Sequence, residues 1–132
     1  MRTAKFKISR IELRAKNRIY IIPEQDDIYD ANDILELIRI MEGLVDSQPY
    51  SIVMLLKKTQ LMLTRDARHV FRNNLEVQKL VLAEAIVTDS MSSMILFNLI
   101  SKVYPPAFPF KAFKHETDAN KWLDAVTLTT AG

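Results

Sequence analysis

The sequence predicts a single α/β domain, spanning residues 1–132, with a mostly parallel but mixed sheet of about five strands and about four flanking helices. Two nearly continuous apolar runs, 50–56 and 80–87, have the length of strands that are buried on both faces. Segments with helical spacing alternate with these runs, which favours parallel strands joined by right-handed crossovers. The expected order is β-β-α-β-α-β-α-β-α. The 132 residues, 48% of them hydrophobic, suffice for one core.

The N-terminal segment predicts two adjacent strands before the first helix. Apolar residues change parity within this segment, so a strand through it needs a bulge or turn near 9–10. A tight reversal at 15–17 leads into a second strand over 18–22. Pro23 ends that strand because proline has no N–H for the ladder.

Three helices are predicted between the later strands. Asp30 is the expected N-cap of the first, Thr64 of the second, and Asp89 or Ser90 of the third. The first helix should end before Pro49, because a proline disfavours helical geometry in the preceding residue. The apolar stripe of this helix recurs at spacings of three and four and comprises Ile34, Leu37, Ile38, Met41, Leu44 and Val45.

The second helix is expected to end at 73–74, since both residues are asparagine, which tolerates left-handed geometry. The strand predicted over 80–87 follows and carries one charge, Glu84, inside an apolar run. The prolines at 105–106 should end the third helix.

The last quarter of the chain predicts a short strand over 108–113 and then an amphipathic helix. We expect Trp122 to lie on the inward side of this helix and to pack on the sheet near Phe113. The apolar residues that share one side recur at i, i+3, i+4 and i+7, and they are Ala119, Trp122, Leu123 and Val126.

A strand ending in Phe113 and a helix carrying Ala119-x-x-Trp122-Leu123 resemble the C-terminal signature of the SpoIIAA-like, or STAS-type, α/β domain family. The predicted order of elements is similar to that of this family over essentially the whole chain. Proteins with this signature occur in bacteria especially. The resemblance implies a non-enzymatic regulatory or protein-interaction module.

The resemblance also points to Thr64 as a candidate regulatory phosphorylation site. In STAS domains a serine opens the helix after the central strand, and its phosphorylation abolishes binding to a partner. Thr64 matches that position, but Leu63 stands where the family has an acid, and no glycine follows. Thr64 is therefore read either as a helix cap alone or as a phosphorylation site.

The third predicted helix is apolar nearly all round, which indicates that it is fully buried or touches something else. Met91, Ile95 and Leu99 form its expected outward row and are the candidate interaction residues. The partner would be another protein, a second copy in a dimer, or an apolar ligand. CRAL-TRIO lipid carriers share a related architecture, so the alternative function is a carrier or sensor of a small apolar ligand or lipid.

Charge is unevenly distributed along the chain. Residues 1–22 hold seven Lys or Arg and one acid, whereas residues 23–46 hold eight Asp or Glu and one base. We expect these two segments to attract each other in the fold. A nucleic-acid site would need basic residues on one surface interleaved with aromatics or glycines, so no nucleic-acid partner is expected.

Several classes of function lack support in the sequence. Cysteine is absent, which removes disulfides, thiolate metal sites and cysteine nucleophiles. His69 and His115 have no carboxylate or second histidine at ligand spacing, and no catalytic motif is recognised, so no metal, cofactor or enzyme activity is expected. No apolar run reaches the roughly 18 residues of a membrane span, and a cytoplasmic location is expected.

Overall fold

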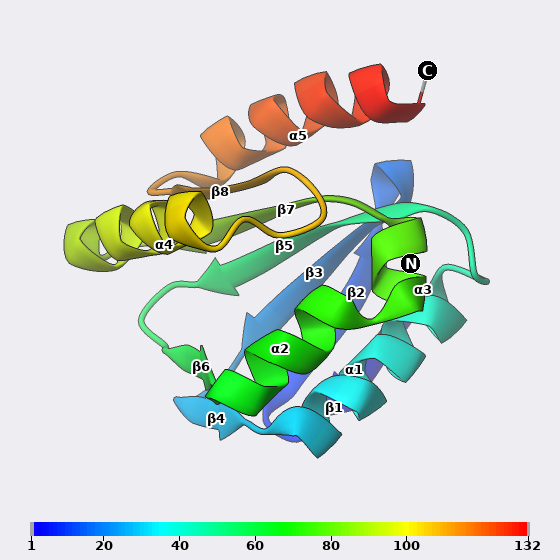
Figure 1. Cartoon of the computed structure of the whole chain (residues 1–132), viewed down its shortest axis with the longest axis horizontal. Coiled ribbons are helices and arrows are strands. Elements are labelled where there is room, and N and C mark those ends of the chain that lie inside the picture. The colour runs from blue at the N-terminus through cyan, green and yellow to red at the C-terminus, as the bar shows by residue number, and fades with distance from the viewer. Residues whose placement is uncertain (1, 132) are drawn as a thin grey trace.

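A six-stranded mixed sheet forms the centre of the fold in the computed structural model, which describes residues 2–131 and the side chains of 2–128 (Figure 1). The strand order is β1-β2-β3-β5-β7-β8. The first three strands are antiparallel and the remaining neighbours pair in parallel. The strands are β1 (Arg2–Phe6), β2 (Ser9–Arg14), β3 (Arg18–Pro23), β5 (Tyr50–Leu56), β7 (Val81–Thr88) and β8 (Phe110–Phe113).

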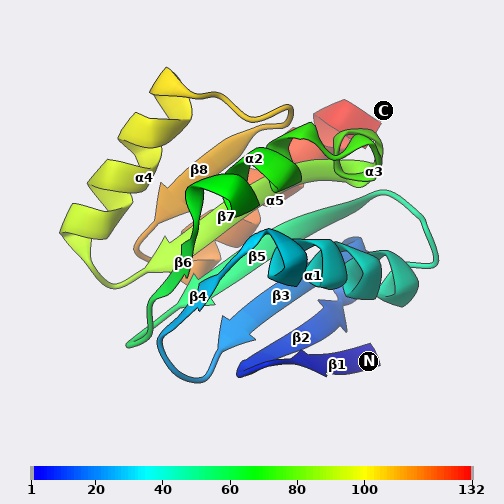
Figure 2. The same cartoon turned by 60° about the horizontal axis from the view of Figure 1, so that its bottom comes forward.

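Helices cover the two faces of this sheet unequally. Figures 1 and 2 show α1, α2 and α3 on one face, α5 alone on the other, and α4 beside β8. On its face, α5 packs against β5, β7 and β8. The helices are α1 (Ala31–Leu44), α2 (Arg65–Asn73), α3 (Leu75–Leu80), α4 (Met91–Val103) and α5 (Glu116–Ala131).

The core lies in two layers because alternate residues of a strand face opposite sides of the sheet. In β5, Ile52 belongs to the main cluster beneath α1, α2 and α3, whereas Val53 belongs to the cluster beneath α5. Ala119 and Leu123 of α5 are fully buried in the second cluster. The predicted fold class is thus confirmed, as one α/β domain with a mostly parallel sheet.

The sheet has six strands instead of the five expected. A tight turn at 7–8 separates β1 from β2, with Phe6 paired to Ser9 and Lys7 at a φ of 53°. This turn accounts for the parity change that the sequence shows. The second reversal, through the 3-10 turn η1 (Ala15–Asn17), lies where it was predicted.

Two short strands and one short helix were missing from the predicted order. β4 (Asp27–Tyr29) and β6 (Leu61–Leu63) pair in parallel as a separate two-stranded sheet. The pair Asn73-Asn74 does end α2, but Asn74 at once caps α3 by accepting a hydrogen bond from the Val77 amide at 3.0 Å. Three-residue strands and a six-residue helix carry too short a pattern to be recognised by periodicity.

The basic start of the chain and the acidic segment after it do attract each other, as expected. The Arg2 guanidinium pairs with Asp46 at 3.0 Å and donates to the Leu44 carbonyl at 2.8 Å, at the carboxyl end of α1. At the other end of α1, the Lys7 ammonium lies 3.2 Å from Asp33, a residue of the capping box formed with Asp30. The hairpin is thereby tied to both ends of α1.

Candidate functional site

Helix α4 presents an apolar side to solvent. Ser90 caps it by accepting a hydrogen bond from the Ser93 amide at 3.2 Å. The candidate interaction residues Met91, Ile95 and Leu99 are 49%, 59% and 56% exposed and succeed one another at four-residue spacing. We call this surface the α4 face, which comprises Met91, Ile95, Leu96, Leu99, Ile100, Val103 and Tyr104.

The position of α4 at the edge of the sheet explains its exposure. The Asn98 side-chain oxygen accepts a hydrogen bond from the Ala112 amide at 2.8 Å, and its nitrogen donates to the Ala112 carbonyl at 3.3 Å. This amide group takes the place that the peptide of a further strand would occupy beside β8. Met94 and Phe97 turn inward and pack on the main cluster. A helix that lies beside a sheet edge buries only a narrow side, so the remaining apolar surface stays outside.

Thr64 is the N-cap of α2, as the sequence predicts. Its hydroxyl oxygen accepts a hydrogen bond from the Ala67 amide at 3.1 Å, and the side chain is half-buried. The capping role is therefore confirmed. Phosphorylation of Thr64 stays a prediction.

Thr64 and the α4 face lie on separate elements near the same end of the sheet. α2 packs mainly against α1, whereas α4 packs mainly against β8. Both helices follow the carboxyl ends of parallel strands, β5 by way of β6 and β7 directly (Figure 2). The two connections touch where the Asp89 carboxylate accepts a hydrogen bond from the Lys58 amide at 3.3 Å.

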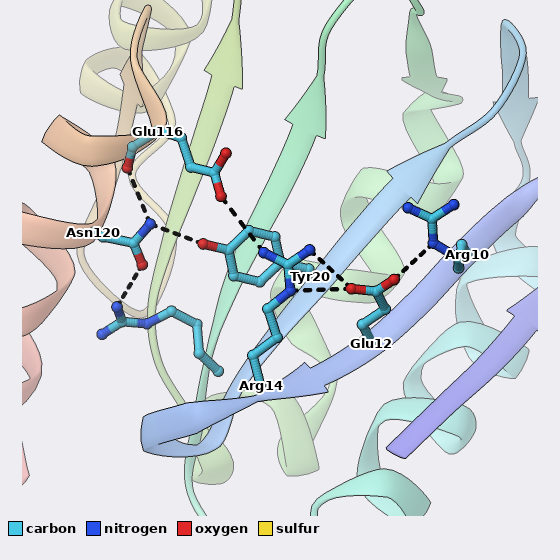
Figure 3. Close-up of polar contacts among 7 residues, drawn as sticks. Arg10, Glu12, Arg14, Tyr20, Glu116 and Asn120 are labelled. Carbon is cyan, nitrogen blue, oxygen red and sulfur yellow. Dashed lines mark hydrogen bonds and ion pairs between the residues drawn. The ribbon is translucent and has the colours of Figure 1, made fainter. Parts of the chain in front are cut away.

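A polar network that sequence reasoning missed lies on the α5 side of β2 and β3 (Figure 3). The Arg14 guanidinium carbon is 3.7 Å from the centroid of the Tyr20 ring, a cation–π contact. One oxygen of Glu12 accepts hydrogen bonds from Arg14 at 2.8 and 3.0 Å, and the other accepts one from Arg10 at 2.7 Å. The hydrogen bonds from Arg14 and, to a smaller extent, from Arg10 hold the pKa of Glu12 below its usual range.

The network continues through Arg18 into α5. Arg18 is 4% exposed and donates hydrogen bonds to Ser51 at 3.1 Å, Asn120 at 2.7 Å and Asp124 at 3.0 Å. Lys16 also binds Asp124, at 2.9 Å, and the bonds from Lys16 and then Arg18 lower the pKa of Asp124. A buried guanidinium needs partners of this kind, because an unpaired buried charge is costly.

The ion pairs and hydrogen bonds of this network connect the hairpin to α5. An open hollow of about 220 Å³ lies against it. Each cation that borders the hollow already has a carboxylate partner, and Lys16 and Arg18 share Asp124. The surplus of bases in the first 22 residues was the available signal, but the partners of Lys16 and Arg18 lie about a hundred residues later in the chain. The lining residues are Arg14, Ala15, Lys16, Arg18, Tyr20, Asn120 and Asp124.

Glu84 is a second polar group with an unusual environment. It lies in the middle of β7 and is 7% exposed, and burial raises its pKa to about 7. Nearby on β5, the buried Tyr50 hydroxyl has no hydrogen-bond partner among the described residues. Burial and then the charges of Glu42 and Glu84 raise the Tyr50 pKa. The sequence shows Glu84 as a charge inside an apolar run, but its depth of burial required the structure.

Among the described residues, neither histidine belongs to a cluster that could hold a metal ion. The His69 ring nitrogen lies 3.3 Å from the amide nitrogen of Asn73, on its own helix. Within residues 2–131, no group of three or more His, Cys, Asp or Glu residues could hold a metal ion. No helix in that part of the chain is both long and apolar enough to cross a membrane.

Comparison with known proteins shows the fold and the family. An uncharacterized protein of the DUF3478 family with a SpoIIAA-like fold, from Shewanella loihica PV-4, superposes with a TM-score of 0.53 at 20% sequence identity. The match covers 87% of this chain and 91% of that chain, so the predicted SpoIIAA-like fold is confirmed. No curated protein matches. A family model described as a domain of unknown function, DUF7793, matches residues 12–127, and the chain therefore belongs to the DUF7793 family.

Proposed function

We propose that this protein is a non-enzymatic, STAS-type interaction module that docks another protein surface through the α4 face. The observation that carries the proposal is the exposure of seven large apolar side chains, six on α4 and the seventh on Tyr104 directly after it. Contiguous apolar patches of this kind on otherwise polar proteins mark interaction sites. The SpoIIAA-like fold supports a regulatory role only by analogy, since one fold hosts many functions.

The alternative, a carrier of a small apolar ligand, needs an apolar cavity between α4 and the sheet. Met94 and Phe97 occupy the inner side of α4 and contact the main cluster. The open hollow described above borders β3 and α5, away from α4. The filled inner side of α4 and the position of the hollow therefore favour a docking function over a carrier function.

Site-specific photo-crosslinking in the native host tests the proposal. A photoreactive residue replaces Ile95, and a matched one replaces Leu75, an apolar residue of α3 that is 77% exposed and lies off the α4 face. We expect a discrete protein adduct from position 95 and none from position 75. Native mass spectrometry of the purified protein accompanies the experiment.

Two results would overturn the proposal. Equal labelling from positions 95 and 75, or none from either, means that the α4 face docks nothing. Co-purification of a stoichiometric lipid, released when Phe97 is replaced by Ala, supports the carrier instead.

A further inference from the structure

We propose that the occupant of the α4 face is a second copy of this chain, packed with its α4 antiparallel about a twofold axis. This inference rests on the proposed function, because it names the partner of the same docking face. Four observations favour a second copy: the closed edge of β8, the near absence of charge, the area of the face, and the spacing of its residues.

The edge of β8 is closed to strand pairing. Asn98 uses both its donor and its acceptor on the Ala112 peptide, so a strand from another molecule would have to displace α4 to pair there. Association on this side of the molecule is therefore left to the outer side of α4. That outer side consists of side chains, and it calls for a helix or another apolar surface as its partner.

The α4 face offers almost no charge with which to select a different protein. Lys102 is the single charged residue between positions 91 and 104. Partners that differ in sequence are commonly distinguished by complementary charges at an interface. An uncharged apolar face meets its own copy without repulsion, and a twofold contact of one patch with itself is the commonest form of assembly.

The size of the face suits a dimer. Its seven apolar residues are between 42% and 67% exposed. These fractions leave roughly 700 Å² of surface per copy, close to the roughly 800 Å² that each partner gives to a standard interface. Left uncovered, a patch of this extent would promote aggregation.

The spacing along α4 gives the face a twofold pattern. An axis placed level with Phe97 and Asn98 sets Leu96 opposite Leu99 of the second copy, and Ile95 level with Ile100. It also sets Ser92, the small residue on this side, opposite Val103. Large side chains thus meet large ones near the axis, and Ser92 leaves room for the helices to approach.

Sedimentation equilibrium at micromolar concentration measures the association. We expect a monomer–dimer equilibrium for the wild-type chain and a dissociation constant raised at least tenfold in Ile95→Lys, because a lysine at the centre of an apolar contact lacks a partner. Leu75→Lys introduces the same charge at an even more accessible apolar site and should leave the dimer intact. Circular dichroism confirms that both variants are folded.

Disulfide trapping tests the antiparallel arrangement directly. The chain contains no cysteine, so only introduced thiols react. Ser92→Cys and Val103→Cys should form a mixed disulfide when combined, and neither should cross-link to itself, since a disulfide requires Cα atoms within about 7 Å. A parallel pair would instead cross-link Ser92→Cys to itself and would overturn the antiparallel arrangement.

The outcomes separate this inference from the proposed function. A wild-type monomer overturns the second copy, as does a dimer that Ile95→Lys leaves unchanged. If the chain is monomeric but position 95 still photo-crosslinks to a different protein, the proposed docking function is retained and only the inference of a second copy is wrong. If the chain is monomeric and position 95 captures nothing, both proposals fail.

Discussion

The indole of Trp122 packs on the ring of Phe113, with the ring centroids 5.6 Å apart and the planes inclined by 52°. This contact joins the last strand to the last helix, where the sequence predicts it. Trp122 is only partly buried, however, and Leu123 beside it is fully buried. Trp122 therefore covers the rim of the second cluster, and Leu123 fills its interior.

Trp122→Ala should destabilise the fold by about 2–3 kcal/mol, below the about 3–5 kcal/mol of a fully buried aromatic residue, because part of the indole already faces water. Leu123→Ala should cost about as much or more. Urea denaturation measures both, with the exposed Lys121→Ala as the control, expected within about 0.5 kcal/mol of wild type. A loss below about 1 kcal/mol for Trp122→Ala would show that the packing on Phe113 contributes little.

Replacing Thr64 by Ala should cost about 1 kcal/mol, since the Ala67 amide loses its acceptor. Thr64→Ser keeps the hydroxyl and should be nearly neutral. Thr64→Asp should be neutral or stabilising, because an acid at a helix N-terminus accepts the same bond and complements the dipole. Thermal unfolding compares the three variants, and unfolding caused by Thr64→Asp would contradict the cap geometry.

The pH dependence of stability should carry a contribution from Glu84. Its folded-state pKa is raised to about 7 from the ordinary 4.5, so between these values the folded chain holds a proton that the unfolded chain releases. The free energy of unfolding therefore falls as the pH rises through this window. Below about pH 4.5, Glu84 is protonated in both states and the free energy of unfolding is not reduced. Above about pH 7, Glu84 is ionised in both states and the free energy of unfolding is lower by about 3 kcal/mol.

Glu84→Gln should remove this loss and make the protein more stable than wild type at pH 8. Chemical denaturation between pH 4.5 and pH 8 gives the difference between the two proteins. Burial and the charge of Glu76 also raise the pKa of Glu42, so the wild-type curve contains a contribution from Glu42. The difference between wild type and Glu84→Gln isolates the contribution of Glu84. Equal curves for the two proteins would show that Glu84 ionises normally in the fold.

Asn98→Ala should leave the Ala112 amide and carbonyl without partners at the edge of β8. We expect a loss of about 1–3 kcal/mol, the range for unsatisfied backbone groups, and faster hydrogen exchange at the Ala112 amide. Ser92→Ala, on the outer side of the same helix, serves as the control. Protection of the Ala112 amide that survives in Asn98→Ala would show that Asn98 does not shield the edge.

The parts of the fold that the sequence predicts are those with a long local pattern. The stripe of α1 and the apolar runs of β5 and β7 extend over seven residues or more, and the caps at Asp30, Thr64 and Ser90 sit at the predicted positions. The short elements β4, β6 and α3 carry no such pattern and were missed. Local sequence therefore reports long elements and their starts.

The candidate site is less accessible to sequence reasoning because it depends on contacts between distant residues. The outward row from Met91 to Leu99 could be recognised, since a single sheet-facing stripe cannot include every apolar residue of α4. The reason for its exposure could not be recognised, because Asn98 has an ordinary polar place in a helical pattern. The bond from Arg18 to Asp124 spans 106 residues and has no local signature.

The unequal cover of the sheet gives the molecule one face that responds to salt and another that responds to protons. On the α5 side, the pairs that Asp124 forms with Lys16 and Glu116 with Arg14 stand partly in water, and added electrolyte weakens them. On the opposite side, Glu84 lies beyond the reach of mobile ions, and its carboxyl responds to pH alone. High ionic strength thus weakens the contacts between the hairpin and α5, whereas high pH destabilises the core beneath α1, α2 and α3.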